Sequence, residues 1–359
     1  MAECSANPNT RRIGWIDFAR AIAILLVVFT HCHEISEWKE IIPVSIAYSI
    51  DRLGVPLFFM ISGALTLPKA SAMSPWAFYK RRLRIPQFIF LIFFWTVLTN
   101  AIGLVVTEHS SLARSFNFAL QKRNGISSNY GLAVHMWFMY AIISIYLLMP
   151  FLAKLAVKLS TREIVILIAV MVLLYQFNDT LRIVLKIHPD NYRYAEKNDF
   201  EAYFSYFLIG FLIAHRIKIQ SCFKVNLGLA LAIIVMALFS LALDLRFNQA
   251  IPGGIHWYSY SLAIFIAGVC ILVLIKNLTS KRWKFNTPRY VYLLSRYSFG
   301  IYLSHVFFIY LAKVIMQRVG YTPDNMYTNA IILFVFSLLS SFALTALLSK
   351  QKYLKFLVI

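Results

Sequence analysis

Long apolar runs constrain this chain most, because a membrane-spanning helix needs about 20 mostly apolar residues. Of the 359 residues, 60% are hydrophobic and only 14% are charged, far from the balance of soluble domains. The runs predict an all-α, polytopic integral membrane protein with about ten transmembrane helices and no appended soluble domain within residues 1–359. The expected spans are 14–34, 53–68, 85–106, 135–152, 163–177, 203–214, 225–243, 258–275, 298–316 and 329–348.

Basic residues between these runs predict the topology. The chain carries 35 Lys and Arg against 15 Asp and Glu, a net charge of +20. Most basic residues fall in every second connection, and short basic connections stay on the cytoplasmic side. We therefore expect both termini to be cytoplasmic. The positive charge lies between apolar runs rather than on a soluble face, so no nucleic-acid partner is expected.

The spacing of cysteine and histidine residues argues against a structural metal site. The four cysteines contain no CxxC pair, so neither a disulfide framework nor a zinc site is expected from them. His31 and His33 are two residues apart on an expected helix, and such residues point to different faces. The sequence therefore predicts no bound metal.

Ionisable residues in the first span are the leading functional candidates, because charged groups are costly in a bilayer. Arg20 and His31 are 11 residues apart, about three helical turns, so they share a face and lie about 16 Å apart along the axis. Asp17 reaches the same face three residues before Arg20. Histidine exchanges protons near neutral pH, which makes His31 the candidate general base. Plainer interpretations are a histidine bonded to a neighbouring helix and a self-contained Arg20–Asp17 ion pair.

Two more features lie at the second and third spans. Arg81 and Arg84 belong to a compact basic run, and guanidinium groups bind phosphate oxygens in a bidentate manner. They are candidates for holding the phosphates of a nucleotide-bearing donor such as coenzyme A. Topology alone would also produce a basic cytoplasmic connection here. Ser62 is a weaker candidate, because small residues in membrane helices more often serve packing.

Two later segments add candidate supporting residues. His135 and Trp137 stand at the start of one expected span, and Tyr302 and His305 lie in the ninth. These side chains are candidates for contact with a substrate. Trp and Tyr at helix ends are also common anchors at the membrane interface, which is the plainer interpretation.

Five short motifs occur in an order found in one known family. Arg20 and His31 form an R-x10-H pattern, and the segments FFMISGAL, RRLR, HMWFMYAI and FGIYLSHVFF follow. Over nearly its whole length the chain resembles the membrane-bound acyltransferase family 3, whose O-acyltransferases modify surface polysaccharides and related glycans. Ala64 departs from the pattern, since the family often has an aromatic residue after Ser-Gly, and this weakens the case for Ser62.

The resemblance implies an O-acyltransferase of the cell inner membrane, with acetyl as the expected group. It implies that His31 is catalytic, that Arg20 is its motif partner beside Asp17, and that Arg81 and Arg84 associate with acetyl-coenzyme A or another acyl-coenzyme A. The nucleotide would stay at the cytoplasmic face while the acyl-bearing arm reaches His31 through the bundle. A glycan or glycolipid acceptor would enter from outside. Direct transfer and prior acylation of the histidine both remain open.

Two other functions fit parts of the pattern. A transporter or flippase for a glycan or lipid-linked sugar would line its path with Arg20 and His31. A non-catalytic partner of glycan-assembly proteins would need neither side chain. Acceptor recognition would fall to outer segments, in which Tyr130, Trp257 and Tyr258 could stack on sugars or anchor the interface.

Overall fold

The computed structural model describes residues 13–82, 85–122, 131–185, 200–247, 257–258, 261–280, 287–323 and 325–358. Helices account for most of the residues in these ranges, and none of them forms a strand. This confirms the all-α fold class, which follows from the need to satisfy every backbone polar group within its own segment in lipid.

Nine helical segments in the described ranges are long and apolar enough to cross a membrane. They are α1 (Gly14–Ile35), α2 with α3 (Ile41–Asp51 and Gly54–Ser71), α5 (Ile85–Thr107), η1 with α7 (Val134–Met136 and Trp137–Lys158), α8 with η2 and α9 (Thr161–Val172, Leu173–Phe177 and Asn178–Val184), α11 (Phe223–Phe247), α12 (Leu262–Thr279), α13 (Arg289–Arg318) and α14 (Met326–Lys350). The chain is therefore a multi-pass membrane protein.

The sixth expected span, 203–214, is helical but shorter than the others. α10 (Phe200–Phe211) continues as the π-helical turn η4 (Leu212–Arg216) and ends at an exposed arginine. Most of its side chains are buried against α3 and neighbouring helices, so this segment serves the core of the bundle. The remaining short helices are α4 (Pro75–Arg82), α6 (Leu112–Lys122) and η6 (Lys355–Leu357).

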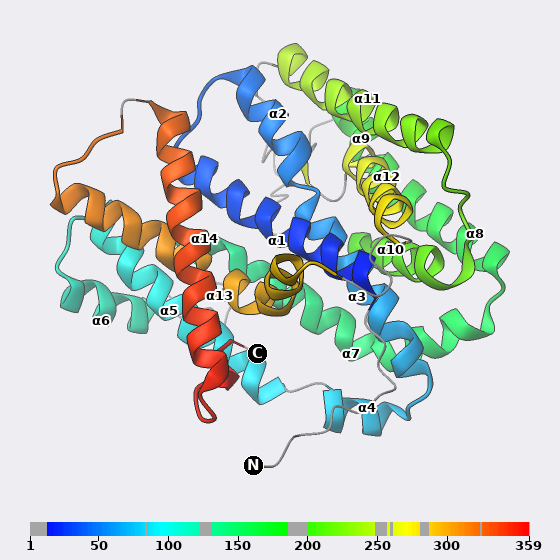
Figure 1. Ribbon diagram of the computed structural model, residues 1–359, viewed down its shortest axis with the longest axis horizontal. Helices are drawn as coiled ribbons and strands as arrows, with labels where there is room; N and C mark the ends of the chain where they lie inside the picture. Colours follow the sequence, from blue (N-terminus) through cyan, green and yellow to red (C-terminus); the bar gives the residue numbers. More distant parts are fainter. Residues whose placement is uncertain are drawn as a thin grey trace.

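α1 and α13 lie at the centre of the bundle. α1 packs against α3, α12, α13 and α14, and α13 also packs against α5. Figure 1 shows α1 crossing the middle, with α5 and α14 on one side and α10 and α12 on the other. The Nζ of Lys313 on α13 donates to the carbonyl oxygen of Ile35 at 3.2 Å. This bond caps the C-terminal end of α1 four residues after His31 and so restrains that part of the helix.

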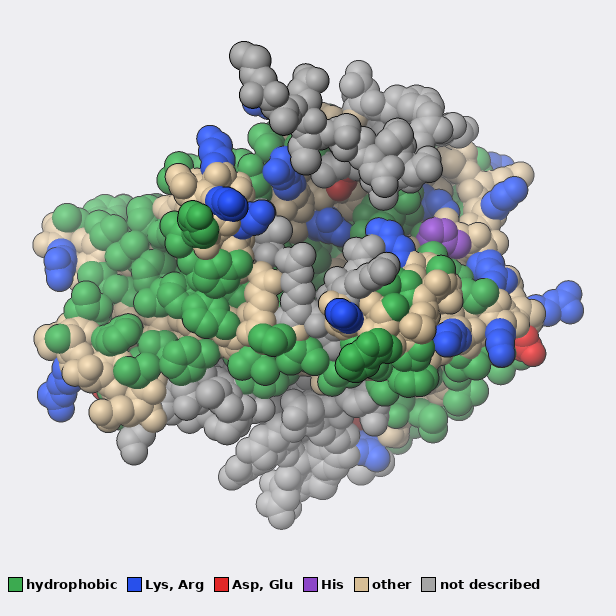
Figure 2. All heavy atoms as spheres, turned by 90° about the horizontal axis from the view of Figure 1, so that it is seen from below, with side chains coloured by type: hydrophobic (Ala, Val, Ile, Leu, Met, Phe, Trp, Pro, Cys, Tyr) green, Lys and Arg blue, Asp and Glu red, His purple; other side chains and the backbone are tan. Residues whose placement is uncertain are grey.

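The outer helices present apolar side chains to their surroundings. On α11, Leu231, Ile234 and Leu238 are each more than half exposed, which fits contact with lipid tails. Figure 2 shows the face on which α4 lies in Figure 1. Lys and Arg side chains gather around the middle of that face, beside broad hydrophobic areas.

Two glycines let α3 and α10 cross with their backbones in contact. A Cβ atom on Gly63 would lie 2.1 Å from the carbonyl oxygen of Phe207, and one on Gly210 would lie 2.0 Å from that of Met60. Small residues at such crossings allow close helix packing in membranes. Packing therefore accounts for the glycine of the FFMISGAL segment, in which Ser62 is half-buried.

We expect Gly63→Ala to destabilise the protein by about 1–3 kcal/mol, because the added methyl group would force the two backbones apart. The measurement is the temperature at which detergent-solubilised protein loses its monodisperse elution. Gly228→Ala on α11 is the matched control, since a Cβ atom there would meet nothing within 4 Å. Equal melting temperatures for the two variants would contradict the close crossing.

Candidate active site around His31

His31 is paired with a carboxylate on its own helix. Its Nδ1 lies 3.0 Å from Oε2 of Glu34, three residues further along α1. An ionised carboxylate only accepts hydrogen bonds, so Nδ1 carries the proton and Nε2 keeps its lone pair. A histidine held in this tautomer by a carboxylate is prepared to act as a base through Nε2.

Glu34 also joins α1 to the second transmembrane segment. Its Oε1 accepts hydrogen bonds from the hydroxyl of Tyr48, at 3.1 Å, and from Nη2 of Arg52. Arg52 therefore balances the carboxylate charge in a half-buried position. Sequence reasoning missed Glu34, Tyr48 and Arg52. The acid three residues after His31 was a readable signal, whereas nothing local indicated Tyr48 or Arg52.

Aromatic rings enclose Arg52 on two sides. Its guanidinium carbon lies 4.6 Å from the ring centroid of Tyr48 and 4.4 Å from that of Tyr258. Trp257 stacks on Tyr48 with centroids 4.2 Å apart and donates through Nε1 to Asp244 at 3.0 Å. Trp257 and Tyr258 thus pack on the network around Glu34. Tyr130 lies outside the described residues.

His33 points away from His31, as the helical spacing predicted. Its Nε2 lies 2.7 Å from Oδ2 of Asp51, and both side chains are buried. Tyr48 and Trp38 pack against the His33 ring, with centroids 4.7 and 5.3 Å away. This pair ties α1 to the end of α2. Within the described ranges, no group of three or more His, Cys, Asp or Glu side chains is arranged to hold a metal ion.

Three imidazoles from distant parts of the sequence come together. The ring centroid of His31 lies 5.3 Å from that of His305 and 6.1 Å from that of His135, and the latter two are 4.9 Å apart. Tyr302 donates through its hydroxyl to the carbonyl oxygen of His135 at 2.8 Å. The fold therefore places four of the candidate residues in one cluster.

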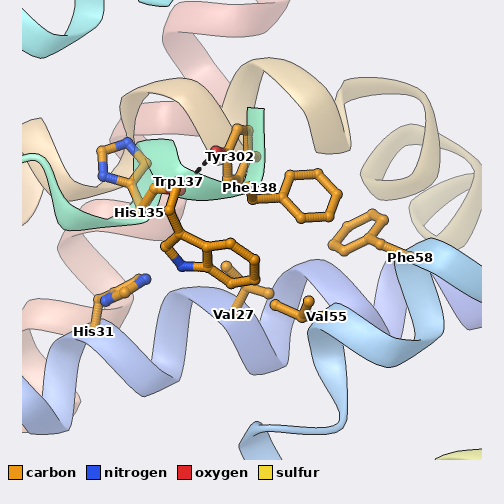
Figure 3. A pocket seen from close by; sticks show the side chains of 8 residues that line it. All are labelled: Val27, His31, Val55, Phe58, His135, Trp137, Phe138 and Tyr302. Carbon is orange, nitrogen blue, oxygen red and sulfur yellow. Dashed lines mark hydrogen bonds between the residues drawn. The ribbon is translucent and has the colours of Figure 1, made fainter. Parts of the chain in front are cut away.

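A small cavity opens beside this cluster. Figure 3 shows His31 and His135 toward one end of the group, Phe58 and Phe138 toward the other, and the indole of Trp137 between them. Val27, one helical turn before His31, contributes an aliphatic wall. The cavity thus has a polar end beside His31 and His135 and an apolar end beside Phe58 and Phe138. Its lining residues are Val27, His31, Val55, Phe58, His135, Trp137, Phe138 and Tyr302.

The remaining candidates lie away from this lining. Asp17 accepts a hydrogen bond from the hydroxyl of Ser295 on α13 at 2.7 Å, and Arg20 is half-buried on the next turn of α1. Neither of them lines the cavity, and nor does Ser62. Arg81 is the last residue but one of α4, whereas Arg84 lies outside the described residues.

The geometry supports proton transfer at the polar end of the cavity. An oriented imidazole with a free Nε2 can remove a proton from a hydroxyl, and the carboxylate behind it stabilises the imidazolium that results. The apolar end can receive a small, uncharged group.

A comparison with family models gives a match over residues 13–350, nearly the whole chain, to a model described as an acyltransferase domain. No curated protein and no solved structure matches the chain significantly.

Proposed function

From the finding that the chain belongs to the acyltransferase 3 family and is a membrane acyltransferase, we propose that it is an O-acyltransferase. Its donor is an acyl-coenzyme A, and its acceptor is a hydroxyl of a surface polysaccharide, glycolipid or related glycan. The observation that carries this proposal is the His31–Glu34 pair at the polar end of an otherwise apolar cavity.

In the proposed reaction His31 is the general base. Its Nε2 takes the proton of the acceptor hydroxyl as the oxygen attacks the thioester carbon. The carbon–oxygen bond forms, the carbon–sulfur bond breaks, and the proton passes from His31 to the departing thiolate. Glu34 holds the ring and balances its charge during the step, and Arg52 and Tyr48 hold Glu34.

The cavity favours a short acyl group. Its apolar end is bounded by Val55, Phe58 and Phe138, and the space between these side chains is small. A space enclosed by closely spaced aromatic side chains fits an acetyl thioester better than a long acyl chain. We therefore assign acetyl-coenzyme A as the donor, with the pantetheine arm entering along α1 from its N-terminal half.

The distribution of charge supports an inner-membrane location with both termini in the cytoplasm. The face that carries α4 gathers Lys and Arg side chains, as short cytoplasmic connections do. Coenzyme A is a cytoplasmic metabolite rich in phosphate, so this face is where its nucleotide end would bind. Arg20 and Asp17 then lie on α1 between that face and His31.

Transfer in a purified system tests the proposed function. Protein in liposomes is supplied with acetyl-labelled coenzyme A and a panel of bacterial O-antigens, capsular polysaccharides and lipid-linked glycans. Label in an acceptor, with release of free coenzyme A, is the expected result. Movement of a glycolipid across the bilayer without any donor consumption would contradict an acyltransferase and favour a transporter.

Removing the Arg81 and Arg84 side chains together is expected to raise the apparent KM for acetyl-coenzyme A roughly 10- to 100-fold, because charged hydrogen bonds to phosphate would be lost. The kcat at saturating donor should change little. Initial rates over a range of donor concentrations measure both constants. Lys158→Ala with Arg162→Ala removes two exposed charges at the α7–α8 turn and is the control. An unchanged KM for the first variant would leave the arginines as topology determinants only.

A further inference from the structure

His135 and His305 each have one imidazole nitrogen that the protein leaves without a partner. Nδ1 of His305 lies 2.7 Å from the carbonyl oxygen of Tyr302, and Nε2 of His135 lies 3.4 Å from that of Leu303. Carbonyl oxygens only accept, so these two nitrogens carry the ring protons. Nε2 of His305 and Nδ1 of His135 are buried and have no hydrogen-bond partner among the described residues. Each is therefore a bare acceptor.

These two acceptors lie next to the proposed base. The ring centroids of His135 and His305 are 4.9 Å apart, and the centroid of His31 lies 6.1 Å from that of His135 and 5.3 Å from that of His305. Buried polar atoms in folded proteins nearly always have partners, so the unpaired acceptor of His135, whose side chain lines the cavity, points to a ligand that supplies a donor. The three imidazoles together offer three lone pairs, because Glu34 occupies only Nδ1 of His31.

The surroundings of the three rings divide their roles. Only His31 has an anionic partner, so it is the ring that can become charged, and it takes the proton of the reacting hydroxyl. That hydroxyl has a single proton and cannot donate to a second ring. Filling the acceptor on His135, the one of these two rings that lines the cavity, therefore requires another donor close to the first. On a sugar ring, the hydroxyl on the neighbouring carbon is such a donor.

We propose that Nδ1 of His135, which lines the cavity, accepts the proton of the hydroxyl adjacent to the one that is acylated, so that the acceptor is a vicinal diol. This rests on the proposed function and specifies its substrate class. The polar end of the cavity would hold the diol, while the apolar end at Phe58 and Phe138 holds the acyl group (Figure 3). A single water molecule donating to both rings is the competing arrangement, and it requires no second hydroxyl.

Deoxygenated acceptors test the proposal with the full-length protein in liposomes. Wild type is assayed with acetyl-coenzyme A and methyl α-D-glucopyranoside, methyl α-D-galactopyranoside and methyl α-D-mannopyranoside, and NMR of the product locates the acetyl group. Removing the hydroxyl on the neighbouring carbon should lower kcat/KM about 10- to 100-fold, since buried acceptors lose their donor. A glycoside that lacks a hydroxyl on a distant carbon is the control and should react like its parent.

Amide substitutions locate the interaction on a particular nitrogen. His135→Asn and His305→Gln each keep an acceptor near the unpaired nitrogen, whereas His135→Gln and His305→Asn move it toward the other one. His135→Asn should retain a preference for the diol over its neighbouring-deoxy analogue and His135→Gln should lose it, whereas the two His305 variants should show the same preference as each other. General damage to folding would affect both variants at a position alike, so this pattern separates recognition from stability.

The outcomes distinguish this inference from the proposed function. Transfer to the glycoside and to its neighbouring-deoxy analogue at equal rates would overturn the diol assignment while leaving the acyltransferase in place. Equal preferences in His135→Asn and His135→Gln would likewise assign the unpaired nitrogen of His135 to water. No transfer by wild type to these glycosides or to the glycan panel, and no donor consumption, would overturn both.

Discussion

His31→Ala is expected to lower the rate of acyl transfer by about 10²–10⁴-fold, the range that a positioned general base contributes. The lost group is the Nε2 lone pair, which the Nδ1 bond to Glu34 leaves free. Initial rates of label transfer from acetyl-coenzyme A to a glycan acceptor, in liposomes with matched amounts of inserted protein, measure the effect. His31→Gln should be as inactive as the alanine variant, because an amide fills the volume but is not basic.

Two controls make this result specific. His109→Ala removes an exposed histidine outside the transmembrane segments and should leave transfer unchanged. The monodisperse elution of His31→Gln in detergent should match that of wild type, since the amide side chain fills much of the volume of the ring. Wild-type rates in His31→Ala would contradict the assigned base and return this histidine to a structural role.

Glu34→Gln is expected to lower kcat by roughly 10²-fold while the KM values for donor and acceptor change little. The amide can still accept a hydrogen bond from His31, but it no longer stabilises the charged ring that forms in the reaction. Steady-state rates at varied donor and acceptor concentrations separate kcat from KM. Glu37→Gln, which removes an exposed charge three residues further on, is the matched control.

The variant Glu34→Gln also leaves Arg52 without its carboxylate, and an uncompensated half-buried charge destabilises a fold. Glu34→Gln with Arg52→Gln removes both charges and should restore thermal stability without restoring kcat. Recovery of kcat together with stability would show that Glu34 acts only by supporting the fold.

Hydrophobic periodicity was sufficient for the membrane fold. Each transmembrane helix satisfies its own backbone hydrogen bonds, so its existence depends on a local run of apolar residues. Nine of the ten expected spans correspond to helical segments of membrane-spanning length. The remaining one, the sixth, corresponds to the shorter α10 with η4. The apolar side chains of that segment are buried by neighbouring helices, and hydropathy alone does not distinguish a helix that faces lipid from one buried in the bundle.

Part of the candidate site was readable for the same reason. The spacing of His31 and Glu34 is a property of one helix, and the opposite directions of His31 and His33 follow from helical geometry. A costly ionisable group in a membrane span identifies its helix as functional without any knowledge of its neighbours. The sequence by itself therefore determined the class of protein and the helix that carries the proposed base.

Only the tertiary structure decided what surrounds that base. The contacts of His31 with His135 and His305, and of Glu34 with Arg52, depend on which helices pack side by side. In a bilayer that choice is governed by close contacts such as the glycine crossing of α3 and α10, because burial of apolar surface does not discriminate between helix and lipid. Such contacts join residues far apart in the chain, and no local pattern in a single sequence encodes their partners.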